Sequence, residues 1–307
     1  SISSKDDIPV EIIVGLPVLL IAVSSSPSVK HAEATLWATT SNSSRNSKLL
    51  LSHGEANQSI SLFLQCLSIS TKSLWSNSNP NFKSPFVLPK IPFNAATDFT
   101  PITYVGYVPN VLVLHPSIPA KNVPELISLA KNNPAQMTYG SSGIGSTQHL
   151  AGALFSKIAK VQMNHVPYKG SGQAIIDLMA GQINMNFDTL PPVLPHIRAG
   201  KLKPLAISTP KRLSILPDVP TFEEVGLKGF EVTNWYSVMG PKNMPKDMVA
   251  KIDAAVRAAM NDPKNKTTLD AQGLQTSGPQ TPDEFSVFLK AELSKYSKLV
   301  KDLNVKA

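Results

Sequence analysis

Hydrophobic and polar positions follow a regular order from about residue 98 to the C-terminus of this 307-residue chain. Short runs that are apolar, or in which apolar and polar residues alternate, are typical of strands. They are interspersed with segments whose apolar residues recur at helical spacing. Strands are expected over residues 104–113, 137–139, 161–166, 183–187, 202–208 and 230–240. Helices are expected over residues 123–131, 150–158, 174–180, 191–199, 245–261 and 281–303. This order predicts an α/β fold with a largely parallel sheet.

The last of these helices carries the clearest start signal. Thr281 and Glu284 form a capping box, and Pro282 occupies the first helical position. The apolar stripe of this helix consists of Phe285, Phe288, Leu289, Leu293, Tyr296, Leu299 and Val300. A long amphipathic helix so late in the chain is expected to pack against the domain that the N-terminal residues build.

The first ninety residues follow a different pattern. Residues 8–23 are the most apolar stretch, but a transmembrane helix needs about 20 such residues, and this one contains Glu11 and two prolines. It is either an uncleaved signal peptide, with residues 31–34 as the cleavage site, or a buried strand over residues 10–14. We favour the strand, because no basic segment precedes it, and we expect the targeting segment to have been removed already. Residues 24–84 contain 17 serines and one glycine, with leucine clusters at 49–51 and 62–64 that are compatible with strands.

Composition excludes several classes of protein. Apolar residues make up 42% of the chain and charged residues 16%, so it can bury a core. The net charge of +8 comes mostly from residues 101–307, where no polybasic run and no aromatic–basic interleaving points to nucleic acid. The single cysteine, Cys66, excludes a disulfide framework and a cysteine-based zinc site. The six histidines show no metal-ligand spacing, so neither a metal nor a cofactor is expected.

One loop stands out, over residues 140–149, because it follows a strand, opens a helix and contains three glycines, three serines and a threonine. In an α/β sheet, ligands bind beyond the carboxyl ends of the strands, and the free amides of a helix start attract an anion. The alternative is a plain turn whose serines cap the helix. Residues 169–172 repeat the strand–loop–helix arrangement and add the cation of Lys169, and two such loops at one sheet edge favour a binding site.

Motifs of covalent and nucleotide chemistry are incomplete. Gln148 stands where a dinucleotide fingerprint needs its third glycine, and Ile144 stands where a nucleophile elbow needs glycine. His149 and His165 are expected to be hydrogen-bonded structural residues. Asp188, at the end of a strand, either accepts from a ligand amine or caps the next helix.

Several long motifs in residues 98–307 resemble one family. They include TYGSSGIGSTQHLAGALF (138–155), VPYKGSGQAIIDLMAGQINMNFDTLPPVLPHIRAG (166–200) and KRLSILPDVPTFEEVGLKGFEV (211–232). The chain resembles the Bug family, the periplasmic substrate-binding proteins of tripartite tricarboxylate transporters. The resemblance implies a two-lobed, Venus-flytrap fold of the type II periplasmic-binding-protein class. Lobe 1 would comprise residues 1–114 and 231–307, and lobe 2 residues 115–230, with the ligand between them.

The resemblance also carries site residues, chiefly on the loop at 141–149 and more weakly on two segments that face the cleft in the family. The residues expected to contact the ligand are Ser141, Ser142, Gly143, Gly145, Ser146, Thr147, Gln148, His149, Tyr168, Lys169, Gly170, Asp188 and Thr189 in lobe 2, and Leu16 and Pro17 in lobe 1. Residues 16–90 otherwise lack the family's glycine-rich first-lobe motifs, although the length of this stretch is preserved. Preserved length with lost identity favours a shifted reading frame or misassigned residues there over ordinary divergence.

The resemblance implies a receptor that does no covalent chemistry. It would capture a small carboxylated solute (a dicarboxylate, a tricarboxylate, an acidic amino acid or an aromatic carboxylate) in the periplasm and deliver it as a monomer to membrane transporter subunits. Two alternatives remain open: a sensor that signals to a membrane kinase, and an enzyme that uses Asp188, His149 or Lys169. No complete set of nucleophile, base and orienting group in the sequence supports the enzyme.

Overall fold

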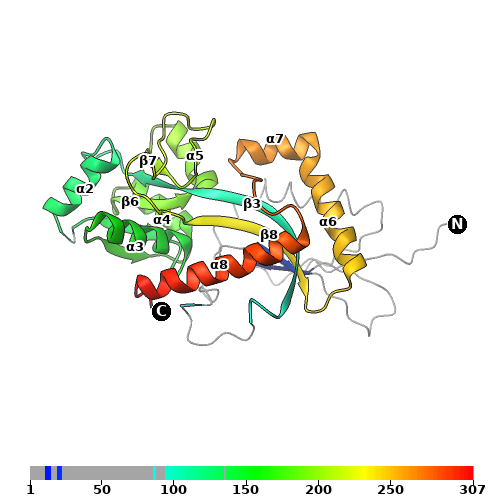
Figure 1. Ribbon diagram of the computed structural model, residues 1–307. Helices are drawn as coiled ribbons and strands as arrows, with labels where there is room; N and C mark the ends of the chain where they lie inside the picture. Colours follow the sequence, from blue (N-terminus) through cyan, green and yellow to red (C-terminus); the bar gives the residue numbers. More distant parts are fainter. Residues whose placement is uncertain (1–10, 15–18, 23–85, 88–93, 135, 307) are drawn as a thin grey trace.

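The computed structural model of the chain is shown in Figure 1, and it describes residues 11–14, 19–22, 86–87, 94–134 and 136–306. The expected strand at residues 10–14 is found as β1 (Glu11–Val14). Leu16 and Pro17 lie outside the described residues, as do the leucine clusters at 49–51 and 62–64 and nearly all of the stretch at 16–90.

Every strand and helix expected beyond residue 100 is present, with its ends shifted by up to five residues. The strands are β1, β2 (Leu19–Ala22), β3 (Phe99–Leu114), β4 (Thr138–Ser141), β5 (Asn164–Pro167), β6 (Met185–Thr189), β7 (Lys203–Ile207) and β8 (Thr233–Pro241). The helices are α2 (Val123–Asn132), α3 (Thr147–Ala159), α4 (Ser171–Met179), α5 (Leu190–Arg198), α6 (Lys246–Asn261), α7 (Pro263–Ala271) and α8 (Pro282–Asp302). Among the described elements, β2 and α7 were not expected from the sequence; the residues KNKTTLD of α7 show no apolar periodicity.

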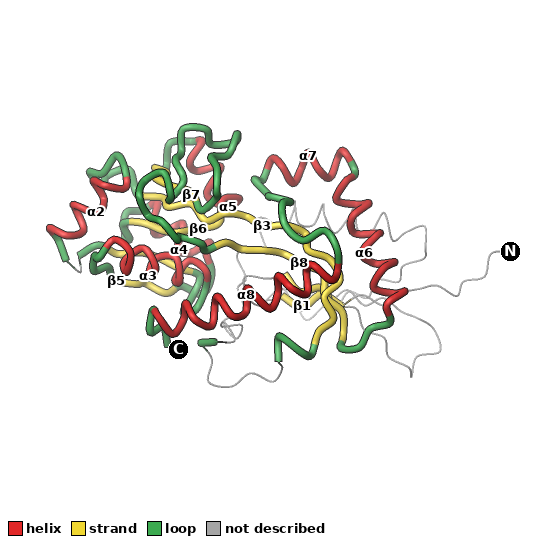
Figure 2. The backbone as a smooth tube through the Cα atoms, viewed as in Figure 1, coloured by secondary structure: helices red, strands yellow, loops and turns green. Residues whose placement is uncertain are grey.

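The long strand β3 joins two sheets. Residues 99–109 of β3 pair antiparallel with β8, and β8 continues through β2 to β1; we call these strands the β8 sheet. From Asn110 onward β3 pairs with β6 on one side and β7 on the other, and β6 continues through β4 to β5; we call these strands the β6 sheet. Figure 2 shows β3 and β8 running lengthwise between two groups of helices. The exchange of pairing partners therefore occurs within β3, between Pro109 and Asn110.

Alternation along β3 builds both sides of the β6 sheet. Leu112 and Leu114 pack with α2 and α3, whereas Val111 and Val113 pack with α4 and α5. Because successive side chains of a strand point to opposite faces, one apolar run serves two helical layers. Strands β4, β5 and β6 are parallel, and β3 is antiparallel to β6 and β7. The expected largely parallel sheet is thus confirmed for this part of the chain.

The β8 sheet is covered in the same way by α6 and α8. Ile102 and Val108 of β3 pack with α6, and Tyr104 of β3 packs with Phe285 of α8. Two register shifts interrupt the pairing of β3 with β8, the second between Tyr104 and Gly106. At Gly106, where φ is +147°, a Cβ atom would approach the carbonyl oxygen of Gln275 to 2.6 Å. Glycine is required there because the neighbouring Tyr107 and Gln275 exchange backbone hydrogen bonds.

Helix α8 reaches further than the sequence suggested. Its first half packs on the β8 sheet, as expected, through Phe285 and Leu289. Its second half contacts α3 and the end of the chain through Tyr296 and Val300, which cluster with Leu150. The Tyr296 hydroxyl also donates to the carbonyl oxygen of residue 233 at 3.0 Å. Helix α8, whose course is seen in Figure 1, therefore packs on the β8 sheet with its first half and against α3 of the β6 sheet with its second half.

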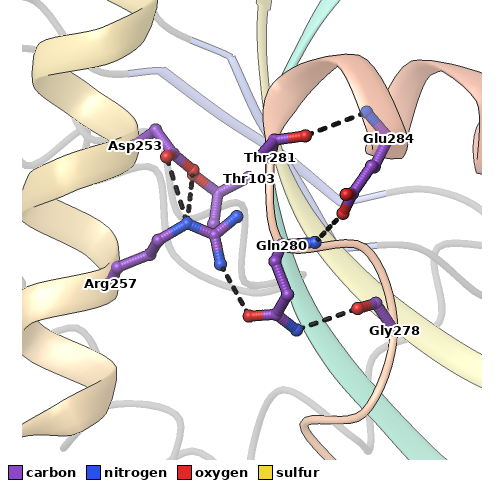
Figure 3. Close-up of polar contacts among 7 residues, drawn as sticks. All are labelled: Thr103, Asp253, Arg257, Gly278, Gln280, Thr281 and Glu284. Atoms are coloured by element: carbon purple, nitrogen blue, oxygen red, sulfur yellow. Dashed lines mark hydrogen bonds and ion pairs between the residues drawn. The ribbon is translucent and has the colours of Figure 1, made fainter.

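The start of α8 is fixed by polar contacts that also hold α6 (Figure 3). The Thr281 hydroxyl accepts from the amide of Glu284 at 3.2 Å, which confirms the capping box in part. The Glu284 carboxylate accepts from the amide of Gln280, one residue before the expected partner, at 2.7 Å. Arg257 of α6 contacts both Gln280 and Asp253, and the Asp253 carboxylate accepts from Thr103 of β3 at 2.8 Å. These residues fasten α6, β3 and the start of α8 to one another.

Candidate functional site

Three helices begin at the carboxyl edge of the β6 sheet. Helix α3 follows β4, α4 follows β5 and α5 follows β6, and the three strands are parallel, so their helix N-termini lie at one edge. We call residues 141–149 the first loop and residues 167–171 the second loop. The amide of Tyr168 donates to the carbonyl oxygen of Ser141 at 2.9 Å, which ties the two loops together. Free amides and aligned peptide dipoles make this edge suited to an anion.

The first loop is shaped by two glycines and a cap. Gly143 and Gly145 have φ values of +136° and +80°, which disfavour any residue with a Cβ atom. The Ser146 hydroxyl oxygen accepts from the amide of His149 at 3.3 Å, so Ser146 is the N-cap of α3. The alternative reading of these serines as helix caps is therefore correct for Ser146.

Five amides of the first loop find acceptors within the loop, those of Ser142, Gly143, Gly145, Ser146 and His149. The amide of Gly143 donates to the hydroxyl oxygen of Ser141 at 3.1 Å, and the amide of Gly145 donates to Nδ1 of His149 at 3.1 Å. Ser141 is fully buried. These donors are directed at partners of the protein itself, so the amides that remain for a ligand belong to other residues of the loop.

A stack of rings supports this arrangement. The imidazoles of His149 and His165 are parallel to within 6°, with ring centroids 3.7 Å apart, and Tyr139 stacks on His165 at 5.0 Å. Nε2 of His165 lies 2.6 Å from the hydroxyl oxygen of Ser141. Burial lowers the pKa of His149 to about 4, and burial together with the neighbouring His149 lowers the pKa of His165 to about 3. Both imidazoles are therefore neutral at pH 7.

A buried carboxylate anchors the other side of the first loop. Asp188 accepts from Nε2 of Gln148 at 3.0 Å, from Nδ2 of Asn186 at 3.0 Å and from the amide of Thr189 at 2.8 Å. Oε1 of Gln148 in turn accepts from the hydroxyl of Ser142 at 2.5 Å. Burial raises the pKa of Asp188 to about 6, although the hydrogen bonds from Gln148 and Thr189 oppose the rise. The Gln148 side chain thus spans from Asp188 to Ser142, and both of these partners are residues of the protein.

A third buried group ties the first loop to the long strands. The hydroxyl of Thr147 donates to Oδ1 of Asn234 on β8 at 2.7 Å, and Nδ2 of Asn234 donates to Oδ1 of Asn110 on β3 at 2.9 Å. The amide of Asn110 donates to the Ser208 hydroxyl at 2.8 Å. Asn110 is the residue at which β3 exchanges its partners. The N-terminus of α3 is therefore connected to the strands that link the two sheets.

The second loop is held by fewer contacts. Gly170, at φ +156°, is the N-cap of α4 and provides no side-chain cap. Lys169 is exposed. The phenol of Tyr168 is engaged by Asp177, in the second half of α4; burial first, and then this hydrogen bond and charge, raise its pKa to about 12. Its hydroxyl is thus directed along α4 rather than at the first loop.

Helix α5 offers fewer amides than its neighbours. Thr189 is its N-cap and provides no side-chain cap, and Pro191 and Pro192 come after the first helical residue, Leu190. Proline has no amide hydrogen, and the amide of Thr189 is occupied by Asp188. The edge therefore presents its amide donors chiefly at α3 and α4.

The expected site residues thus fall into two groups of different character. One group lies at the helix starts, and it consists of Ser142, Gly143, Gly145, Ser146, Thr147, Lys169 and Gly170. The other group is turned toward the protein and supports the first, and it consists of Ser141, Gln148, His149, Tyr168, Asp188 and Thr189. Sequence reasoning missed Asn110 and Asn234. The only signal for them was a polar residue within an apolar strand.

Two chemical possibilities can be weighed on these contacts. A serine lies beside a histidine, Ser141 and His165, but the serine is buried and the depressed pKa of His165 makes it a weak base. Among the residues that the structure describes, no group of three or more His, Cys, Asp or Glu side chains is arranged to hold a metal ion. In the same residues, no helix is long and apolar enough to cross a membrane. The arrangement is suited to reversible binding of an anion.

Comparison with known proteins agrees with this chemistry. Residues 72–305 match the family model described as tripartite tricarboxylate transporter family receptor. The protein BugT of Bordetella pertussis is 32% identical over 77% of this chain and 72% of its own length. A UPF0065 protein from the tcbD-tcbE intergenic region of Pseudomonas sp. strain P51 is also 32% identical, over 72% of this chain. The chain spans 66% of the length of that relative.

Solved structures of the same kind share the fold. A Rhodopseudomonas palustris protein solved with adipate is 33% identical, with a TM-score of 0.67 over 72% of this chain and 73% of its own. A protein described as a periplasmic transporter is 39% identical, with a TM-score of 0.67 over 72% of this chain and 74% of its own. MatC from R. palustris, solved with bound malate, is 29% identical, with a TM-score of 0.64 over 70% of this chain and 74% of its own. The α/β fold of periplasmic binding proteins is thereby confirmed.

Proposed function

Because this chain belongs to the family of tripartite tricarboxylate transporter receptors, we propose that it captures a small carboxylated solute between two lobes and delivers it to membrane transporter subunits. The ligand is a dicarboxylate or a solute of similar size, since relatives were solved with adipate and with malate. Capture takes place in the periplasm, and the receptor acts as a monomer. The solute leaves unchanged, as in a family of transport receptors.

The observation that carries this proposal is the pair of helix starts at one sheet edge. Thr147 begins α3 and Ser171 begins α4, and the two loops that precede these residues are joined by a hydrogen bond. Each start presents amide hydrogens at the positive end of a helix dipole, where a carboxylate gains about 0.3–1 kcal/mol per helix from the dipole. Lys169 adds a mobile positive charge beside α4. One carboxylate end of the solute binds there.

The other end of the solute binds to lobe 1. The division expected from the sequence puts residues 1–114 and 231–307 in lobe 1 and residues 115–230 in lobe 2. Because residues 110–114 of β3 pair with β6 and β7, we propose that the boundary on β3 lies at Asn110 instead. Flexing occurs where β3 and β8 pass between the sheets, at Pro109–Asn110 on β3 and near Thr233 on β8. Closure excludes water from the carboxylate and strengthens its contacts with the helix starts.

A sensor for a membrane signalling partner would use the same binding step. Transport is favoured because the family model describes transporter receptors. An enzyme acting on a carboxylate is disfavoured by the weak basicity of His165 and by the use of Asp188 as an acceptor for three protein donors.

The test is a thermal-shift series on dialysed protein with adipate, malate, citrate, glutamate and benzoate. At 100 times the dissociation constant a ligand adds about 2.7 kcal/mol to the free energy of unfolding, which raises Tm by about 5 °C or more. The matched control is adipamide, which has the length of adipate without its charges. A shift with a carboxylate and none with adipamide, and unchanged solute by NMR after incubation, supports the proposal.

Two results would contradict it. Equal shifts with adipate and adipamide would mean that no carboxylate is recognised. Formation of any product from the bound solute would identify an enzyme. Sequencing peptides of residues 16–90 by mass spectrometry accompanies the series, because it establishes which lobe-1 residues the protein carries.

A further inference from the structure

The stacked histidines adjoin the first loop, of which His149 is the last residue. His149 belongs to the first turn of α3, and His165 belongs to β5, so the pair joins two elements that are separated in the chain. Their parallel rings, with centroids 3.7 Å apart, are sandwiched between the first loop and Tyr139. A Cβ atom at Gly152 would approach the Tyr139 ring to 2.2 Å, so Tyr139 is packed tightly against α3.

Each imidazole engages the loop through a nitrogen atom. Nδ1 of His149 accepts the amide hydrogen of Gly145 at 3.1 Å. Nε2 of His165 contacts the hydroxyl of Ser141 at 2.6 Å, and that hydroxyl oxygen accepts the amide hydrogen of Gly143 at 3.1 Å. The two glycines with positive φ are therefore the two whose amides are held, one by each histidine.

This arrangement requires neutral rings. A proton on Nδ1 of His149 would remove the acceptor of the Gly145 amide, and two protonated imidazoles at this separation would repel each other. The groups that face the pair among the described residues are Tyr139, Ser141 and the loop backbone, none of which is charged at pH 7. Burial keeps both rings unprotonated.

We propose that His149 and His165 are positioning residues, which fix the left-handed turns at Gly143 and Gly145 so that the remaining amides of the first loop converge on the ligand carboxylate. The proposal rests on the proposed function of the site. It differs from a purely structural role of the stack, because the ring nitrogens, and not only the ring faces, are required.

The experiment separates the effect of the hydrogen-bonding ring nitrogen from the effect of the ring face. His149→Asn keeps an acceptor near the place of Nδ1 and removes the ring, whereas His149→Phe keeps the ring and removes the acceptor. The matched pair at the other position is His165→Gln and His165→Phe. Amide exchange of Gly143 and Gly145 is measured by NMR in the ligand-free protein, and the dissociation constants for adipate and malate are measured by calorimetry.

A positioning role predicts that His149→Phe accelerates exchange of the Gly145 amide by about fivefold, the effect of one net hydrogen bond, and weakens carboxylate binding by a similar factor. His149→Asn should restore both values to within about twofold, even if its Tm is the lower of the two. His165→Phe should act in the same direction on Gly143, with rescue by His165→Gln.

The opposite ranking would overturn the proposal. If His149→Phe behaves like the wild type and His149→Asn loses loop protection, the stack acts through its ring faces alone. If neither adipate nor malate binds the wild type, the proposed function fails for these ligands, and amide exchange alone decides the role of the histidines. The failure of one proposal is therefore distinguishable from the failure of the other.

Discussion

The first and second loops occupy equivalent places at the same sheet edge and are built in different ways. The first loop is braced by His149, by His165 acting through Ser141, and by Gln148, which Asp188 holds. Among the residues that the structure describes, the second loop is held to the first by the backbone hydrogen bond from Tyr168 to Ser141, and Gly170 has a φ of +156°. Its helix α4 has no side-chain cap, whereas Ser146 caps α3.

In the proposed site, this difference implies that the two helix starts contribute to anion binding in different ways. A braced loop loses little conformational entropy when a ligand binds, so it contributes a fixed geometry. A helix start without a side-chain cap, beside an exposed lysine, contributes a charge that can adapt to the ligand. Substitutions of the residues that brace the first loop are therefore expected to alter stability and affinity together. Substitutions in the second loop are expected to alter affinity alone.

The largest effect is expected at Asp188. Asp188→Ala would leave the buried donors of Gln148, Asn186 and Thr189 without an acceptor and should lower the free energy of unfolding by about 3 kcal/mol. Urea unfolding at pH 7 measures it.

The matched variant is Asp188→Asn. Oδ1 of Asn186 is buried and has no hydrogen-bond partner in the part of the chain that the structure describes. If the Asn186 amide turns over, Oδ1 can accept from the new amide at position 188, and the other contacts survive. Asp188→Asn should therefore remain within about 1 kcal/mol of the wild type. Equal losses in the Ala and Asn variants would show that the charge itself is needed.

The second effect concerns pH. The pKa of His149 in the folded protein, about 4, lies below its ordinary value of 6.5. Between these two values the unfolded chain binds a proton at this histidine and the folded chain does not. Stability is present above pH 6.5 and is lost as pH falls toward 4, at about 1.4 kcal/mol per pH unit for each such histidine. His149→Asn should reduce this slope by about that amount in unfolding curves at pH 6.5, 5.5 and 4.5.

Asp188 changes the stability with pH in the opposite direction, so its contribution must be removed before the histidine slope is measured. Its folded pKa, about 6, is raised above the ordinary 3.8, so its contribution is present below pH 4 and is lost as pH rises toward 6. The histidine slope is therefore measured in the Asp188→Asn background, with and without His149→Asn. An unchanged slope in the double variant would mean that His149 is protonated normally in the folded protein.

A smaller effect is expected at the connection between the first loop and β8. Asn234→Ala would leave the hydroxyl of Thr147 and Oδ1 of Asn110 unpaired, at a cost of about 2 kcal/mol in the free energy of unfolding. Carboxylate affinity should fall with it. The control is Asn132→Ala, an exposed position on α2 that should change stability by less than about 0.5 kcal/mol. If Asn234→Ala lowers the stability but leaves the carboxylate affinity unchanged, the hydrogen bonds of Asn234 do not contribute to binding.

The smallest effect is expected in the second loop. Lys169 is exposed, so Lys169→Met should leave Tm unchanged and weaken carboxylate binding by about threefold at low salt, and by less at 0.5 M salt. Lys131→Met, on the exposed surface of α2, should change neither quantity. Equal affinities of the Lys169 variant and the wild type at low salt would remove the lysine from the site.

The pattern of the sequence was sufficient for the elements and for the two loops. Periodicity predicted every helix beyond residue 100 except α7, whose buried residues are only Asn265 and Leu269. Glycines and hydroxyl residues between a strand and a helix predicted the first loop, because few other uses require that combination. The capping box at Thr281 was predicted, although Glu284 reaches Gln280 instead.

The local sequence pattern could not predict which of the expected site residues bond to other residues of the protein. Gln148 and Asp188 are 40 positions apart, and Thr147 and Asn234 are 87 apart, so only the packing of α3 beside β6 and β8 could pair them. The sequence by itself determined where strands end and helices begin, because these depend on residues within a few positions of one another. The tertiary structure decided which polar groups form hydrogen bonds within the protein. Each buried donor and acceptor needs a partner, and that partner can lie far away in the sequence.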